Sequence, residues 1–538
     1  MGFLTETYWI DLLVFVIFIL LVIYFILNIN YGYWDKRGVP NLKKGGLIMN
    51  QITGKQTQSE TVKEWYNQFQ GEKYFGFIQL TKPMLMVRDL DLINQIMVKD
   101  FNHFQDRGQP ENKNDPITNN LFGMRGQMWR EMRYKLTPTF TTGKLKGMFD
   151  QVTQCGGNMI SRIDEQISKE SPELNCKDFL FEYTADVIAS CAFGIQFEPN
   201  SPEFNDFKSI VQSVFQPSAW SLVKILVGFT FPKLAESLNI RPFMAKRNVD
   251  YFKGLISEAA KYRKENNLKR NDYLQLLLTL KEQEDKGELS HSMLMTNDTT
   301  EDDEVILEQM KYSGDHEKPL ATNVKLFTDD TVCANSVIFL IAGSESTSSS
   351  ISLTLYQLAL HLDIQQRLQK EIDTVLSNHK GQWSYQAMKE MTYLDQVVQE
   401  SQRMYPIIPL LQRECTKTYK VPDSDLVIEK GVIVTIPVAG LHLDPQHYPD
   451  PETFNPDRFE GNNFKPNPAF LPFGDGPRIC IAMRFAVMEV KVSVARIMAN
   501  FTVTMSPKTH VPLKLDPRSF VPLPKGGMWL KFEKRQKA

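Results

Sequence analysis

The sequence predicts an α+β fold that is predominantly helical, in which a single large domain with minor β-sheets follows an N-terminal transmembrane helix. The 538 residues alone would suggest three or four domains, but the interior contains no Gly/Ser-rich or Pro-rich linker and no internal repeat. From about Gln127 onward most apolar stretches are long and helical in period, whereas strand-like patterns are short. An uncharged apolar segment near the N-terminus predicts the membrane helix.

That apolar segment, Leu12–Leu27, contains sixteen residues and no charge. With Trp9, Ile10 and residues 29–33 it supplies the ~20 residues that a bilayer span needs. The positive-inside rule places the rest of the chain in the cytosol, because Glu6 and Asp11 precede the segment and basic residues follow it: Lys36, Arg37, Lys43 and Lys44. Residues 1–33 are therefore predicted to be a single-pass anchor. A cleaved signal peptide is the alternative, but a basic start and an Ala-x-Ala site are lacking.

Residues 34–60 are predicted to form a hinge, at Gly38-Val39-Pro40, and the start of the body; residues 61–535 are predicted to form the main domain. Within the main domain the apolar patterns predict long helices at 179–193, 329–361 and 481–500. Strands and turns are expected at 74–80, 84–87, 421–438 and 514–532. Residues 282–318 hold twelve acidic residues against three lysines, which predicts an exposed, mobile acidic surface loop.

Overall charge and cysteine usage exclude several classes of protein. The net charge of −2 gives no reason to expect nucleic-acid binding. The six cysteines are scattered and include no CxxC pair, which argues against a disulfide framework and against a structural zinc site. A reducing compartment fits this usage.

The stretch from Phe473 to Cys480 is the most informative part of the chain. A glycine- and proline-rich loop ends in Cys480, and the next twenty residues are predicted to form a helix. Free backbone N–H groups and the positive end of the helix dipole favour a thiolate at that position. Gly474 and Gly476 let the backbone turn tightly around the sulfur. A buried structural cysteine is the alternative interpretation of Cys480.

This loop resembles the haem-binding loop of the cytochrome P-450 family, Phe-x-x-Gly-x-Arg-x-Cys-x-Gly. Phe473, Gly476, Arg478 and Cys480 match the pattern, and Ala482 stands where the family usually has glycine. The resemblance implies that Cys480 is the axial thiolate ligand of a haem b iron.

The same resemblance implies a set of residues that bind the haem propionates. Trp129 and Arg133 lie four apart, on one face of a predicted helix, and both side chains are hydrogen-bond donors only. The family uses Trp-x-x-x-Arg in this way, and the resemblance adds Arg107, Arg413 and Arg478. Trp129 as ordinary core packing is the alternative.

Two further motifs lie on predicted helices. Glu400 and Arg403 form Glu-x-x-Arg, in which positions i and i+3 share a helix face and can form an ion pair. Pro456-Asp457-Arg458-Phe459 resembles a family segment whose arginine joins this pair in a buried structural triad. A helical salt bridge on the surface is the alternative.

The run Ala342-Gly343-Ser344-Glu345-Ser346-Thr347 follows an apolar stretch and resembles the oxygen-binding helix of the family. Gly343 is expected to leave room for O₂. An acid beside an alcohol, Glu345 beside Ser346, can relay protons through water into the oxygen site, with Thr347 next to them. Ser346 occupies the position where the family usually has threonine. A hydroxyl that only binds the backbone carbonyl four residues earlier is the alternative.

The resemblance covers about residues 34–535. Within the family, the chain looks like the microsomal branch, which contains insect detoxification enzymes. It implies a monooxygenase of the endoplasmic reticulum membrane, with a cytosolic catalytic domain and a hydrophobic small-molecule substrate. The sequence contains no GxGxxG or Walker loop for its own nucleotide. Electrons from NADPH are therefore expected from NADPH–cytochrome reductase, with cytochrome b5 as a possible second donor. The expected substrate-facing segments are residues 109–122, 207–238, 339–346, 407–411 and 520–523.

Two alternatives remain at this point. Some haem-thiolate relatives rearrange peroxides without a reductase, but they tend to lack the acid and alcohol that Glu345 and Ser346 supply. A haem sensor without enzymatic activity would not need a propionate site, a proton relay and a membrane anchor together.

Overall fold

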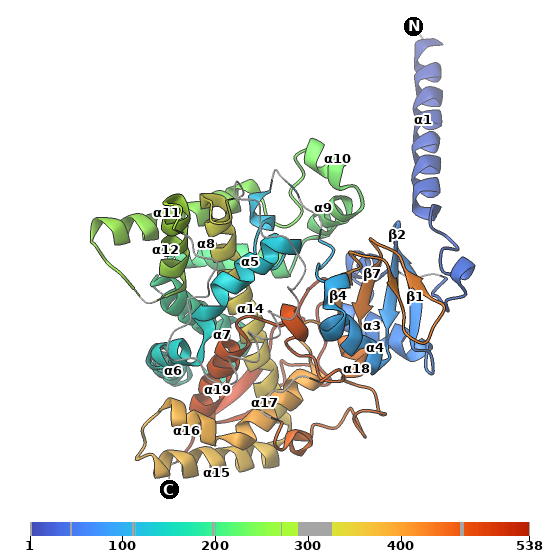
Figure 1. Ribbon diagram of the computed structural model, residues 1–538. Coiled ribbons are helices and arrows are strands. Elements are labelled where there is room, and N and C mark those ends of the chain that lie inside the picture. Colours follow the sequence, from blue (N-terminus) through green and yellow to red (C-terminus); the bar gives the residue numbers. More distant parts are fainter. Residues whose placement is uncertain are drawn as a thin grey trace.

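The computed structural model describes residues 3–43, 46–109, 112, 115–169, 171–195, 198, 201–270, 272–288, 325–462 and 467–536. The described part is a mainly helical body with three small β-sheets (Figure 1), which confirms the predicted predominance of helices with minor sheets. Most of the acidic segment 282–318 lies outside the described residues; its start, Glu282–Asp285, ends a helix.

Helices supply most of the body. The early helices are α2 (Leu47–Thr53), α3 (Gln58–Gln68), α4 (Leu90–Asn94), α5 (Gly126–Leu136), α6 (Thr142–Lys169) and α7 (Cys176–Ile188). The next group is α8 (Pro202–Phe215), α9 (Ala219–Thr230), α10 (Pro232–Ser237), α11 (Lys246–Glu265) and α12 (Tyr273–Asp285). The last group is α14 (Asp329–Leu360), α15 (Leu362–Asn378), α16 (Tyr385–Glu390), α17 (Thr392–Met404), α18 (Val438–Leu441) and α19 (Met483–Asn500).

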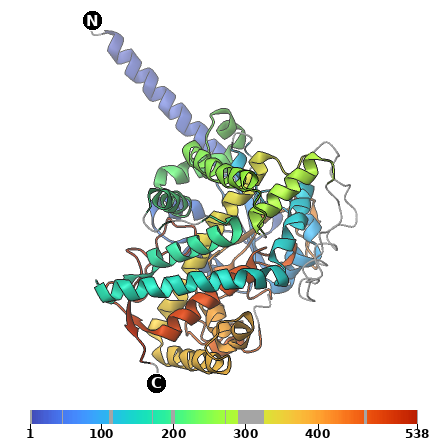
Figure 2. The same ribbon diagram turned by 90° about the vertical axis from the view of Figure 1, so that its left-hand side faces the viewer.

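Helix α14 runs through the centre of the body and packs against α7 and α19 (Figures 1 and 2). Its start is well specified, because the Thr328 side chain accepts a hydrogen bond from the Thr331 N–H and two aspartates lie in the first turn. Several of its buried serines and threonines keep a hydrogen bond by donating to the carbonyl four residues earlier; Ser344, Ser352 and Thr354 do so.

The largest sheet has the strand order β1–β2–β7–β4, formed by β1 (Tyr74–Gln79), β2 (Lys82–Val87), β7 (Ile433–Ile436) and β4 (Leu411–Glu414). A second sheet has the order β3–β9–β8, formed by β3 (Glu173–Asn175), β9 (Trp529–Lys534) and β8 (Phe501–Met505). The third is the pair β5 (Tyr419–Lys420) and β6 (Val427–Ile428). The first sheet lies beside the helical part (Figure 1), so loops from both parts can meet between them.

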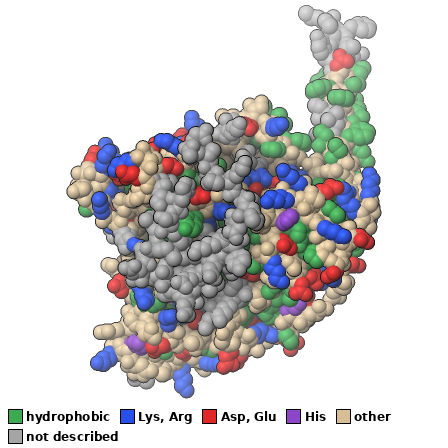
Figure 3. Space-filling view, viewed as in Figure 1, with side chains coloured by type: hydrophobic (Ala, Val, Ile, Leu, Met, Phe, Trp, Pro, Cys, Tyr) green, Lys and Arg blue, Asp and Glu red, His purple; other side chains and the backbone are tan. Residues whose placement is uncertain are grey.

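The N-terminal helix α1 (Phe3–Asn28) projects from the body beside the first sheet (Figures 1 and 2), and hydrophobic side chains gather along it (Figure 3). Within the described residues, however, no single helix is both long and apolar enough to cross a bilayer; α8 and α9 meet that requirement only as a pair bent by 58°. The predicted transmembrane helix is therefore not confirmed.

The segment predicted to be a hinge, Gly38-Val39-Pro40, is packed and paired in the structure. The Gly76 N–H of β1 donates to the Pro40 carbonyl at 2.7 Å, and the Leu42 N–H donates to the Gly76 carbonyl at 2.9 Å. Val39 is also buried. Backbone pairing with a sheet edge removes the freedom that a hinge requires.

Candidate active site

The loop before α19 is held by its own backbone and by a neighbouring helical turn. The Cys480 N–H donates to the Phe473 carbonyl at 2.9 Å, so the two ends of the loop meet. Gly476 has φ of +66°, and a Cβ there would lie 2.0 Å from the carbonyl oxygen of Met97. Only glycine fits this approach. The helix after the cysteine is confirmed: α19 begins at Met483, and Ala482 is its N-cap residue.

The surroundings of Cys480 act on its thiol in two opposite directions, and its role as a haem ligand stays a prediction. Burial raises the pKa of the Cys480 thiol above its usual value, and this effect outweighs the Ala482 N–H and the charges of Arg133 and Arg107, which lower it. The helix N-terminus favours the thiolate, but without a bound metal the cost of burying the charged form is larger.

Four arginines surround this loop with little compensating negative charge. Burial lowers the pKa of Arg107 to about 10, of Arg133 to about 10 and of Arg413 to about 9. Burial also lowers the pKa of Arg478 well below its usual value, and Arg107 and Arg413 add to this by repulsion. Burying these guanidinium cations costs free energy. Anions that bind in the same site would offset that cost.

Two of these guanidinium groups keep hydrogen-bonding capacity for such an anion. The Nε atoms of Arg133 and Arg413 are buried and have no hydrogen-bond partner within the described part of the chain. The arginines and Cys480 therefore fit haem b. Its two carboxylates can pair with guanidinium groups, and its iron can bind a cysteine thiolate. The same described residues contain no group of three or more His, Cys, Asp or Glu that could hold a metal ion by itself.

Arg478 is fixed in place mainly by carbonyl groups. Its Nε donates to the Gln105 carbonyl at 2.8 Å, and its Nη2 donates to the Met124 carbonyl at 2.8 Å. Its guanidinium carbon lies 3.8 Å from the ring centroid of Trp129, on α5. Arg107 in turn donates to the Arg478 carbonyl at 3.1 Å. The structure thus brings Trp129 and two of the predicted arginines together.

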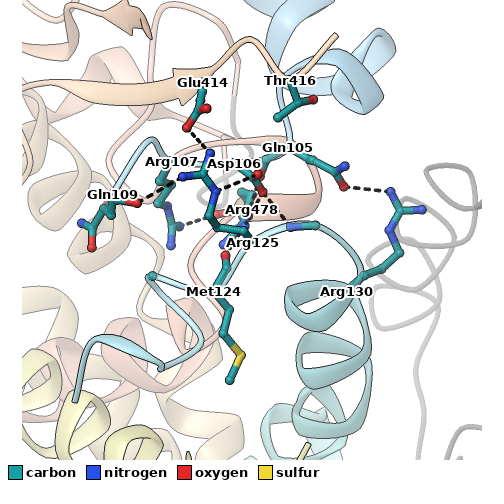
Figure 4. Close-up of polar contacts among 12 residues, drawn as sticks. Gln105, Asp106, Arg107, Gln109, Met124, Arg125, Arg130, Glu414, Thr416 and Arg478 are labelled. Carbon is teal, nitrogen blue, oxygen red and sulfur yellow. Dashed lines mark hydrogen bonds and ion pairs between the residues drawn. The ribbon is translucent and has the colours of Figure 1, made fainter. Parts of the chain in front are cut away.

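A carboxylate that the sequence analysis missed organises this region (Figure 4). Asp106 is buried, accepts a hydrogen bond from the Gly126 N–H at the start of α5, and lies 3.6 Å from Arg478. Arg125 forms ion pairs with both Asp106 and Glu414 of β4. Asp106 precedes Arg107 in the sequence, but the partners of its carboxylate come from two distant segments, so no local pattern identified it.

One strip of α14 is less buried than the rest of that helix. From Thr331 to Ala359 every residue is buried except Ile338, Ala342, Gly343 and Ser346. Positions 338, 342 and 346 repeat every four residues and therefore share one face. The Ser346 hydroxyl donates to the Ala342 carbonyl at 2.6 Å, so the backbone bond considered as an alternative role is present. Between Thr331 and Ala359, this strip is the part of α14 whose residues keep some exposed surface.

Gly343 has a packing role that the sequence analysis did not foresee. A Cβ on Gly343 would lie 3.0 Å from Cγ1 of Ile188, at the end of α7. The missing side chain thus lets α14 approach α7 closely. The expected room for O₂ is not the only reason for a glycine at this position.

Glu345 points toward α7. Its carboxylate forms an ion pair with Lys177 at 2.7 Å, and both side chains are largely buried. Lys177 also donates to the Ser348 hydroxyl at 2.5 Å. Burial lowers the pKa of Lys177, while Glu345 opposes that shift. Lys177 lies far from Glu345 in sequence, so only the packing of α7 on α14 identifies it as the partner of the acid.

The triad predicted from the two separate motifs is confirmed as a set of contacts. Arg403 donates to both oxygens of Glu400, at 2.7 and 2.8 Å, and neither side chain is exposed. Arg458 lies 3.5 Å from Glu400. Arg403 also donates to the carbonyls of His442 and Pro451, both at 2.8 Å. The cluster ties α17 to the chain that leads into the cysteine loop.

His442 is a second residue that the sequence analysis missed. It is fully buried, and its Nε2 accepts a hydrogen bond from the Leu471 N–H at 2.9 Å, two residues before Phe473. Burial, together with Arg403, lowers the pKa of His442 to about 3. The neutral imidazole therefore connects the triad with the start of the cysteine loop across the whole physiological range of pH.

Glu489 on α19 is a buried acid with no compensating partner. It is not exposed, and neither carboxylate oxygen has a hydrogen-bond partner in the portion of the protein that is described. Burial raises the pKa of Glu489 well above its usual value. The folded protein therefore holds it neutral, whereas the unfolded chain ionises it above about pH 4.3.

We expect Glu489→Gln to stabilise the protein at neutral and alkaline pH. A raised folded-state pKa adds stability below the unfolded pKa, and this stability is lost as pH rises toward the folded value. Wild type and variant should therefore unfold at similar temperatures near pH 4.5, and the variant should unfold at a higher temperature at pH 8. Glu533→Gln, on an exposed strand position, is the control and should change neither value. Equal unfolding temperatures at pH 8 would contradict a neutral Glu489.

The predicted substrate-facing segments are only partly described. In 109–122, positions 110, 111, 113 and 114 are outside the described residues. In 207–238 the helices α9 and α10 and the residues that flank α10 expose apolar side chains: Trp220, Phe231, Leu234 and Leu238. A surface pocket of about 300 Å³ lies between α10 and the first sheet, and charged residues line much of it. An apolar substrate is therefore better matched by the strip on α14 than by this pocket.

Known proteins resemble the chain over most of its length. A family model described as "Cytochrome P450" matches residues 40–310 and 303–531. "Cytochrome P450 6a2" of Drosophila melanogaster is 36% identical over 515 residues, which cover 94% of this chain and 96% of that protein. "Probable cytochrome P450 6a14" of the same organism is 34% identical over 521 residues, with coverage of 94% and 96%. "Cytochrome P450 6d1" of Musca domestica is 33% identical over 507 residues, with coverage of 91% and 94%.

Proposed function

The chain belongs to the cytochrome P450 family, and from this premise we propose that it inserts one oxygen atom of O₂ into a hydrophobic small molecule with NADPH-derived electrons from a reductase. Family membership makes it a haem-thiolate monooxygenase, an oxidoreductase that uses molecular oxygen. The substrates we propose are xenobiotics such as plant toxins and insecticides, or fatty acids and hormones.

The observation that carries the proposal is the excess of buried guanidinium charge around the Cys480 loop. Cys480 would bind the haem iron, and Phe473 would pack beside the ring. Trp129 and the arginines would bind the propionates; these are Arg107, Arg133, Arg413 and Arg478. When bound, haem with a thiolate ligand supplies the activation of O₂. Residues 61–535 would form the catalytic domain around it.

On the substrate side we propose that Ser346 and Glu345 deliver protons to the oxygen site. The Ser346 hydroxyl lies on the less buried strip of α14 and can exchange its bond to the Ala342 carbonyl for a bond to water. The Glu345 carboxylate, which pairs with Lys177, would accept a proton and pass it on. Thr347 is buried beside them and would support the local packing.

We expect Ser346→Ala and Glu345→Gln to lower the amount of product formed per NADPH consumed. Loss of a positioned proton donor or acceptor typically costs about 10²–10⁴-fold in a proton-transfer step, and NADPH oxidation would continue without productive transfer. Ser352→Ala is the matched control, because Ser352 makes the same type of backbone bond, to the Ser348 carbonyl, elsewhere on α14. If Ser346→Ala keeps the wild-type ratio of product to NADPH, Ser346 has no role in proton delivery.

We further propose that residues 1–33 anchor the protein in the endoplasmic reticulum membrane in a single pass, with the catalytic domain in the cytosol. The uncharged run Leu12–Leu27 and the basic residues after it support this topology. The reductase partner would be NADPH–cytochrome reductase, with cytochrome b5 as a second donor. The names of the insect relatives are compatible with a role in detoxification.

The decisive experiment combines the protein in membranes with purified reductase, NADPH and a panel of apolar compounds. We expect substrate-dependent NADPH consumption and hydroxylated or epoxidised products. A protein that has bound haem, rearranges a peroxide substrate without reductase and forms no product with NADPH and reductase would instead be a rearranging enzyme. A protein that binds haem but forms no product, whether or not reductase and NADPH are present, would contradict the proposed activity.

A further inference from the structure

The segment that joins α1 to the body is anchored at several separate points. We use the name clasp for Asn30, Tyr33, Trp34 and Arg37 together with the body residue Glu429. Asn30 at its start donates from Nδ2 to the Thr81 carbonyl, between β1 and β2, at 2.5 Å. The turns from α1 into the clasp are themselves hydrogen-bonded, because the Tyr31 and Tyr33 N–H groups donate to the carbonyls three residues earlier.

Trp34 is the deepest contact of the clasp. It is 2% exposed, and its Nε1 donates to the Phe77 carbonyl at 3.1 Å. A Cβ on Gly76 would lie 2.3 Å from Cγ of Trp34. The indole therefore fills a slot on β1 that exists only because residue 76 is glycine.

Arg37, Tyr33 and Glu429 close the clasp on its outer side. The guanidinium carbon of Arg37 lies 3.6 Å from the ring centroid of Tyr33, and its Nη2 lies 2.6 Å from Glu429. The Tyr33 hydroxyl donates to the other oxygen of Glu429 at 2.9 Å. Burial and this hydrogen bond raise the pKa of Tyr33 to about 12, so the hydroxyl stays a donor at physiological pH. Three groups from two distant segments thus satisfy one another.

We propose that Trp34, Arg37 and Glu429 are positioning residues that fix the direction of α1 relative to the body. This inference rests on the proposed function, in which α1 lies in the membrane and the electron donor is bound to the same membrane. A loose linker would let the body rotate freely above the bilayer. A fixed exit direction restricts the orientations of the haem-bearing body and keeps its electron-accepting face within reach of the donor.

The test uses the full-length protein with haem in phospholipid vesicles and in oriented bilayers. The variants are Arg37→Glu, Glu429→Arg and the double exchange, with Glu533→Arg as the control for a reversal at an exposed position. Linear dichroism of the haem measures the spread of body orientations. Stopped-flow reduction by membrane-bound reductase measures the first electron transfer, and turnover with an organic hydroperoxide measures the site without the reductase.

We expect each single reversal to broaden the range of haem orientations and to slow reductase-supported reduction by about three- to tenfold, while hydroperoxide turnover stays unchanged. The double exchange should restore both values, because it restores the ion pair. A purely local structural role would leave the dichroism unchanged, and that result would overturn the proposal. Failure of the wild type to accept electrons from the reductase would contradict the proposed function instead, and the dichroism would still test the clasp.

Discussion

Cys480→Ser is expected to abolish thiolate-type haem absorption and monooxygenase activity. A serine hydroxyl does not ionise at neutral pH, and the surroundings of residue 480 already disfavour a negative charge without the metal. The variant therefore cannot supply an anionic ligand to the iron. Arg107, Arg133, Arg413 and Arg478 remain, so haem can still bind. Turnover should nevertheless fall by more than about 100-fold, more than the loss of a residue that only supports a metal ligand typically costs.

The ferrous–CO difference spectrum of the membrane fraction checks this prediction. Wild type should give the red-shifted Soret band of a thiolate complex, and the variant should lack it. Cys176→Ser is the control, since Cys176 is buried in the core beside β3 and burial raises its pKa in the same way. The control should keep both the band and the activity. A Cys480→Ser protein with the normal thiolate band would remove Cys480 from its assigned role.

Arg403→Ala is expected to give poorly folded protein without haem. Neither Arg403 nor Glu400 is exposed. Among the residues described, the substitution leaves the buried Glu400 carboxylate with Arg458, at 3.5 Å, as its one cationic partner. Breaking a buried ion pair from one side typically costs about 3–5 kcal/mol. Whole domains are stable by only about 5–15 kcal/mol, so the loss is a large share of the total.

Denaturant unfolding and haem content measure the effect of this substitution. Arg367→Ala is the matched control, because Arg367 forms an exposed ion pair with Asp457, with about half of each side chain accessible. Such surface pairs contribute about 0–1 kcal/mol. The double variant with Glu400→Gln and Arg403→Met should lose less stability than Arg403→Ala alone, because no buried Glu400 charge is left unpaired. A haem-replete Arg403→Ala protein of normal stability would show that the triad is dispensable.

Local motifs predicted the elements of the site well. The loop before α19, the helix that carries Trp129 and Arg133, and the central helix α14 all lie where their patterns placed them. Each of these elements is specified by near neighbours in sequence: glycines with positive φ, side chains four apart on a helix, and a capped apolar run. The chemical roles of their side chains remain proposals.

The sequence pattern could not predict which distant residues contact the side chains of the site. Lys177 pairs with Glu345, Asp106 lies among Arg125, Arg478 and the start of α5, and His442 joins the triad to the cysteine loop. Each of these contacts joins segments that are distant in the chain. Their positions follow from how helices and sheet pack, and no periodicity within one segment records that packing.

The sequence by itself determined that a cysteine ends a tight loop before a helix, that the body is mainly helical, and which arginines accompany the cysteine. Tertiary structure alone decided the burial of the Cys480 thiol, the direction of Glu345 and the burial of Trp34 against β1. The physical reason is the same in all three cases. Burial and neighbouring charge set the free energy of an ionised group, and a slot such as that of Trp34 exists only where separate strands and turns meet.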